Sequence, residues 1–144
     1  MTESDTIKLL RECDAGLKMG VASIDEVLDY VKDEAFKKKL IACKDKHEKL
    51  KSEIQEALDD YNDDGKEPNP IAKGMSWVKT NVKLVINESD KTIADLMTEG
   101  CNMGVKSLNK YLNQYKEASE KAKDITKDII KIEEKLVTDI KQYL

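Results

Sequence analysis

Apolar residues recur at steps of three and four along most of the chain, with charged and polar residues between them. This spacing places the apolar side chains on one face of an α-helix. The pattern predicts four long amphipathic helices, over about residues 4–31, 34–61, 91–115 and 118–143. Each helix carries an apolar stripe that has to be buried against a neighbour, so we expect an all-α four-helix bundle.

The periodicity breaks over about residues 62–90. A cluster of Asn, Asp, Gly and Pro residues opens this stretch and indicates a loop. A shorter apolar repeat then predicts an extra short helix over about 71–86. We therefore expect two repeated antiparallel helical hairpins, about 4–61 and 91–144, joined by a long crossover. The length suits a single domain covering residues 1–144.

Residues 16–28 and 100–112 share the motif Gly-x-x-Met-Gly-Val-x-Ser, in the first and third predicted helices. Glycine inside a helix costs about 1 kcal/mol relative to alanine, so its shared placement is informative. The motif contains the glycines Gly16, Gly20, Gly100 and Gly104. We predict that the two helices pack closely at these glycines, near an internal two-fold axis. The alternative is that each glycine separately accommodates a bulky neighbour.

The second and fourth predicted helices also align, with His-Glu-Lys-Leu from His47 matching Glu-Glu-Lys-Leu from Glu133. Both residues lie at mid-helix on the apolar face, so an internal two-fold axis would bring them together. A carboxylate buried without a partner would cost several kcal/mol, and His47 supplies a partner. We expect a structural polar pair that fixes the register of the bundle. A metal or small-ligand site with Cys101 and Asp14 near by, or general acid–base catalysis, are the alternatives.

Charged residues make up 38 % of the chain, both signs are interspersed, and the net charge is −4. Nucleic-acid-binding proteins normally gather Lys and Arg on one surface, so we expect no nucleic-acid partner. No apolar run is long enough to span a membrane, and the N-terminus lacks the apolar segment of a secretory signal. Cys13, Cys43 and Cys101 are too widely spaced to suggest a disulfide framework or a zinc site. Together these features predict a cytoplasmic protein with reduced thiols and no membrane partner.

Two antiparallel helix pairs joined by a long crossover describe the ferritin-like fold. In this architecture and its internal repeat, the chain resembles the uncharacterised bacterial ferritin-like four-helix-bundle proteins over nearly its full length. Members of that superfamily that oxidise iron carry a Glu on each of two helices and Glu-x-x-His on each of the other two. Here Lys44 stands where the Glu before His47 would be, and Ile130 and Glu133 replace the second Glu-x-x-His pair. This departure argues against iron oxidation or storage.

The resemblance implies a non-catalytic helical-bundle protein that acts through binding or assembly, with no cofactor. The alternative is a degenerate metalloprotein that holds a single metal ion or small ligand at His47 and Glu133. A third possibility is a scaffold whose crossover helix, near Trp77, binds a protein partner or a second copy of the chain. A Trp on such a helix is more often a packing anchor, and an exposed Trp77 would mark a partner surface.

Overall fold

The computed structural model describes residues 4–66 and 89–144, and no β-strand occurs in either range. Within them the chain forms four α-helices: α1 (Asp5–Leu28), α2 (Glu34–Asp59), α5 (Asp90–Gln114) and α6 (Glu120–Asp139). A short 3-10 helix, Lys141–Tyr143, follows α6, where the sequence predicts a continued α-helix. The prediction of an all-α helical bundle is confirmed. The helix expected over about 71–86, with Trp77, lies outside the described residues.

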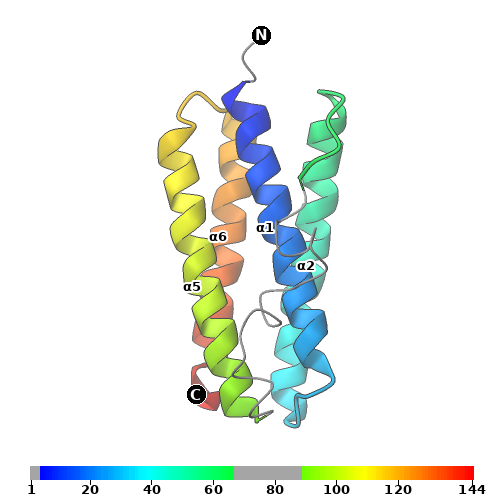
Figure 1. Ribbon diagram of the computed structural model, residues 1–144, viewed down its shortest axis with the longest axis vertical. Coiled ribbons are helices and arrows are strands. Elements are labelled where there is room, and N and C mark those ends of the chain that lie inside the picture. The colour runs from blue at the N-terminus through cyan, green and yellow to red at the C-terminus, as the bar shows by residue number, and fades with distance from the viewer. Residues whose placement is uncertain (1–3, 67–88) are drawn as a thin grey trace.

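The four helices lie side by side along one axis (Figure 1). α1 and α2 form one antiparallel pair joined by a short turn, and α5 and α6 form another. α1 also packs beside α5, and α2 beside α6. α2 and α5 run in the same direction, so the end of α2 and the start of α5 lie at opposite ends of the bundle (Figure 1).

Each helix begins at a residue whose side chain accepts a hydrogen bond from a main-chain N–H of its first turn. The capping residues are Ser4, Asp33, Ser89 and Ser119. A cap of this kind satisfies one of the N–H groups that a helix start leaves unpaired. These local signals explain why the helices begin where they do.

The two helix pairs are tied together at both ends of the bundle by the same kind of hydrogen bond. The main-chain N–H of Asp33 donates to Oδ2 of Asp90, at 2.9 Å. The main-chain N–H of Ser119 donates to the hydroxyl of Thr6, at 2.8 Å. Asp33 and Ser119 cap the second helix of their own pair, α2 and α6. The residues that accept these hydrogen bonds, Asp90 and Thr6, lie in the first turn of the first helix of the other pair, α5 and α1.

The buried apolar residues form two clusters, one in each half of the bundle. One includes Phe36 and Ile93, and the other includes Leu17 and Ile54. Fully burying one such side chain contributes about 1.5–3 kcal/mol. Along each helix the change from one cluster to the other falls around one residue: Gly20 in α1, His47 in α2, Gly104 in α5 and Glu133 in α6. We call this set of four residues the polar level.

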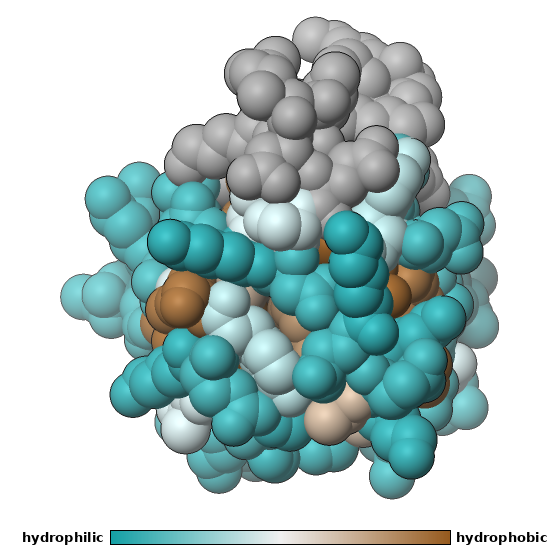
Figure 2. All heavy atoms as spheres, turned by 90° about the horizontal axis from the view of Figure 1, so that it is seen from below, coloured by the Kyte–Doolittle hydropathy of each residue, from teal (hydrophilic) through white to brown (hydrophobic). Residues whose placement is uncertain are grey.

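Hydrophilic side chains cover most of the end of the bundle shown in Figure 2, with apolar residues visible in the spaces between them. No helix among the described residues is both long enough and apolar enough to cross a membrane.

Candidate functional site

The predicted contact between His47 and Glu133 is present. Nε2 of His47 lies 2.7 Å from Oε1 of Glu133, and Nδ1 lies 2.8 Å from the main-chain oxygen of Cys43. A ring that donates from both nitrogens is a protonated imidazole. Burial lowers the pKa of His47, but the hydrogen bonds to Cys43 and Glu133 and the charge of Glu133 outweigh it and raise the pKa to about 10. At neutral pH His47 is therefore an imidazolium hydrogen-bonded to Glu133, while the role of the pair in fixing the register stays a prediction.

At Gly16, Gly20 and Gly104, no backbone atom of the facing helix is among the atoms nearest to an added Cβ atom, and the predicted close packing of α1 against α5 stays a prediction. A Cβ atom on Gly16 would have no described atom within 4 Å. A Cβ atom on Gly20 would lie 2.7 Å from two ring atoms of His47, so this glycine makes room for an imidazole from α2. A Cβ atom on Gly104 would lie 3.9 Å from the carboxylate of Glu133, an ordinary contact with a side chain of α6.

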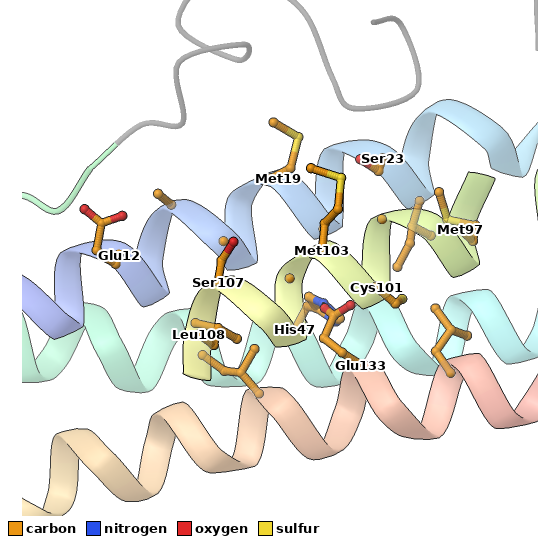
Figure 3. Close-up of a pocket in the computed structure, with 18 of the residues that line it drawn as sticks. Glu12, Met19, Ser23, His47, Met97, Cys101, Met103, Ser107, Leu108 and Glu133 are labelled. Carbon is orange, nitrogen blue, oxygen red and sulfur yellow. The ribbon is translucent and has the colours of Figure 1, made fainter. Parts of the chain in front are cut away.

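Between α1 and α5 lies a cavity of about 500 Å³, within the usual range for small-molecule sites. Its wall on α1 includes Gly16, Met19, Gly20, Ser23 and Ile24. Its wall on α5 includes the residues that align with these in the repeated motif, namely Gly100, Met103, Gly104, Ser107 and Leu108. The motif that we interpreted as a packing interface therefore lines the two sides of this cavity, which is open to the surface at Gly16 and Met103 (Figure 3).

The floor of the cavity is formed by residues of α2 and α6. Among the described lining residues of these two helices, His47 and Glu133 are polar, and Ile129 and Leu136 are apolar and flank them. The thiol of Cys101, on α5, hydrogen-bonds to Glu133. Burial, the charge of Glu133 and this hydrogen bond raise the pKa of the Cys101 thiol far above its ordinary range. Cys101 is therefore a neutral thiol, which is neither a good nucleophile nor a good metal ligand.

Ser23 lies at one end of the cavity (Figure 3). Its side chain is only 5 % exposed, and its hydroxyl has no hydrogen-bond partner among the described residues. Leaving a buried polar group unpaired costs about 1–3 kcal/mol, so such groups are rare in folded proteins. The Ser23 hydroxyl is thus a buried polar group without a partner among the described residues.

Charged groups at the opposite end of the cavity are paired with one another. Nζ of Lys66 lies 2.6 Å from Oε1 of Glu12. The phenol of Tyr111 also hydrogen-bonds to Glu12. Burial, and then the charge of Glu12, raises the pKa of Tyr111, which keeps the phenol neutral at physiological pH.

Asp14 does not join the other candidate metal ligands, and this part of the metal hypothesis is wrong. Asp14 is fully buried and does not line the cavity. Its Oδ2 accepts a hydrogen bond from the main-chain N–H of Lys66 at 2.9 Å and lies 2.7 Å from Nζ of Lys18. It holds the segment after α2 against α1. In residues 4–66 and 89–144, no group of three or more His, Cys, Asp or Glu side chains is placed to hold a metal ion.

The polar level carries polar side chains on two of its four helices only. α1 contributes Gly20 beside His47, and α5 contributes Gly104 beside Glu133. Two of the four helices therefore supply no side chain at this height. With one imidazole and one carboxylate, the polar level lacks the six ligands of a di-iron centre.

Sequence reasoning found the pair on the floor of the cavity and the motif on its walls, but not the cavity itself. Whether the two helices that carry the motif touch or leave a space between them depends on the packing of the whole bundle, which the sequence does not show.

Comparison with known proteins gave no match: no protein-family model, no curated protein and no solved structure is significantly similar to the chain.

Proposed function

We propose that this protein is a non-catalytic binding protein that holds a small, largely apolar molecule in the cavity between α1 and α5. From the sequence, one alternative was a metal ion or small ligand held at His47 and Glu133. The ligand site proposed here is instead the cavity next to that pair. No comparison supports the resemblance to ferritin-like proteins, so it serves here only as an analogy for the arrangement of the helices.

The observation that best supports a binding function is the surroundings of Gly16. Glycine in a helix interior costs about 1 kcal/mol relative to alanine, and no described atom of the fold needs the space that a side chain on Gly16 would take. Packing within the described residues therefore gives no reason for this glycine. Gly16 is exposed and lines the cavity, so its effect is to leave this side of the cavity open.

The chemistry of the lining supports binding rather than catalysis. Both ring nitrogens of His47 are engaged, so the imidazole is not free to act as a base. The thiol of Cys101 is held neutral by its surroundings. A nucleophile paired with a free base, which acyl-transfer chemistry needs, does not occur among the described lining residues.

We also infer that the two helix pairs are structural repeats related by a two-fold axis through the polar level, joined by a crossover as in ferritin-like bundles. Three features support this. The matching motifs face each other across the cavity, the aligned residues His47 and Glu133 are in contact, and the two ends are tied by equivalent hydrogen bonds from Asp33 and Ser119.

Filling the cavity tests the binding function. The neutral fluorescent dye N-phenyl-1-naphthylamine brightens in apolar sites and can be titrated into the purified protein. We expect saturable binding to the wild type and at least tenfold weaker binding to Gly16→Leu, whose side chain would occupy the cavity. The matched control is Ala35→Leu, which adds the same side chain to an exposed position on α2.

Circular dichroism and urea unfolding establish that both variants are folded. Equal dye binding by Gly16→Leu and the wild type, or no saturable binding by the wild type, would overturn the proposal. Binding lost equally in Ala35→Leu would do the same, because that position is remote from the cavity.

A further inference from the structure

Sulfur-containing side chains gather at the cavity. All methionines within residues 4–66 and 89–144, namely Met19, Met97 and Met103, line it, and so does Cys101. Met19 and Met103 occupy the same position of the repeated motif in α1 and α5. Figure 3 shows both on the side of the cavity opposite the polar pair of its floor. A flexible, polarisable methionine side chain adapts to apolar ligands of different shapes, so these residues suit a binding wall.

The three methionines differ in how far solvent reaches them. Met103 is 53 % exposed, whereas Met97 is 4 % exposed. Met19 is partly exposed. Met103 therefore belongs both to the wall of the cavity and to the surface at its opening, and a small solute in water reaches it. Met97 lines the same cavity but is shielded from solvent.

The cysteines are protected from oxidants in a way that Met103 is not. All three thiols are buried. Burial raises the pKa of Cys13 to about 12, and burial together with the charge of Glu133 raises that of Cys101 far above its ordinary range. Peroxides oxidise the thiolate, so neutral buried thiols react slowly. A thioether has no proton to lose, and its oxidation depends on exposure. Among the described residues, Met103 is therefore the sulfur group most open to oxidation.

From these observations we infer that Met103 is an oxidation site that controls binding in the cavity: hydrogen peroxide converts its thioether to a sulfoxide, which weakens the binding of an apolar ligand. In this step a lone pair of the sulfur attacks a peroxide oxygen, an S–O bond forms and the O–O bond breaks. The sulfur loses two electrons and the peroxide is reduced to water. The inference rests on the proposed binding function and adds a modification site to it.

The effect on binding follows from the place of Met103 in the wall. A sulfoxide is polar, and an apolar ligand that covers it offers no hydrogen bond in exchange for the water that it displaces. The converse also holds, because a bound ligand covers the thioether and keeps peroxide away from it. Oxidation should therefore weaken binding, and binding should slow oxidation.

Peroxide treatment of the purified wild-type protein at neutral pH tests this inference. Peptide mass spectrometry locates the added oxygen atoms, and N-phenyl-1-naphthylamine is titrated before and after treatment. We expect Met103 to be oxidised well before Met97, and the oxidised protein to bind the dye about fivefold or more weakly. Reduction by methionine sulfoxide reductases should restore the affinity. Saturating dye should slow the oxidation of Met103.

Met103→Leu isolates the residue, because leucine has a similar volume and contains no sulfur. Without peroxide this variant should bind the dye as the wild type does, and after peroxide it should keep its affinity. Met97→Leu is the matched control and should remain as sensitive to peroxide as the wild type. Each variant keeps every other methionine of the chain, so a difference between them belongs to the residue replaced. Circular dichroism establishes that both are folded.

Oxidation of Met97 before Met103, an unchanged dye affinity after oxidation of Met103, or an equal loss of affinity in Met103→Leu would overturn this inference. If the untreated wild type does not bind the dye, the binding function fails, and this inference fails with it. If the untreated protein binds the dye and Gly16→Leu blocks it, the binding function stands whatever peroxide does.

Discussion

Gly20 and His47 fit together so closely that one extra carbon atom would not be accommodated: a Cβ atom on Gly20 would lie 2.7 Å from Nε2 of His47. The same nitrogen is bound to Glu133. The glycine of α1, the imidazole of α2 and the carboxylate of α6 therefore depend on one another. Because Gly20 has no side chain, the imidazole on α2 can reach the carboxylate on α6 across the core.

Alanine at Gly20 and at Gly16 should have opposite effects on stability. Gly20→Ala should lower the free energy of unfolding by about 1–3 kcal/mol, because the new methyl group displaces His47 from Glu133. Gly16→Ala should raise it by about 0.5–1 kcal/mol, because the methyl group meets no described atom and the helix gains propensity. Urea unfolding of both variants checks this. Two changes of the same sign would contradict the placement of these glycines.

Removing one partner of the buried pair should cost more than removing both. Glu133→Ala should lower the free energy of unfolding by about 3–5 kcal/mol, because it leaves a buried imidazolium without a carboxylate. The double variant His47→Leu with Glu133→Leu should recover most of that loss, since apolar side chains need no partner there. A double-mutant cycle measures the coupling, and strictly additive effects would show that the two residues do not depend on each other.

The stability of the protein should fall as the pH rises from about 6.5 to about 10. The pKa of His47 is raised in the folded protein from its ordinary 6.5 to about 10, so folding favours the protonated ring. This contribution is fully present below pH 6.5 and is lost as the pH passes through the folded value. Urea unfolding as a function of pH measures the slope. The double leucine variant is the control, and an equal slope in both proteins would exclude His47 as its source.

Gly65 should resist substitution for two separate reasons. Its φ of 90° is a backbone conformation that favours glycine, and a Cβ atom there would lie too close to Oδ2 of Asp14. Gly65→Ala should lower the free energy of unfolding by more than about 1 kcal/mol. It should also speed hydrogen exchange at the amide of Lys66, which donates to Asp14. Exchange at the wild-type rate would mean that this hydrogen bond survives the substitution.

The sequence was sufficient for the features that depend on neighbours along one helix. The three- and four-residue spacing of apolar residues predicts the four long helices, and each begins at a Ser or Asp that caps its first turn. The pairing of His47 with Glu133 could also be predicted, because the alignment of the two halves assigned both residues to one height of the core.

The features that the sequence could not supply depend on what lies opposite a residue in space. A glycine shows that a side chain is missing, but not whether a backbone, an imidazole or an open cavity takes its place. Gly20 and Gly16 give two different answers to that question. Asp14 was a candidate ligand because the sequence does not show which groups it binds. One of them is the main-chain N–H of Lys66, fifty-two residues along the chain.

The hydrogen bonds from Asp33 and Ser119 have a consequence for how a molecule could enter the bundle. They hold the two helix pairs together at the ends, while the apolar core is interrupted half-way between them by the polar level. Access to the cavity therefore lies along the length of α1 and α5, where Gly16 and Met103 are exposed, while both ends of the bundle stay closed.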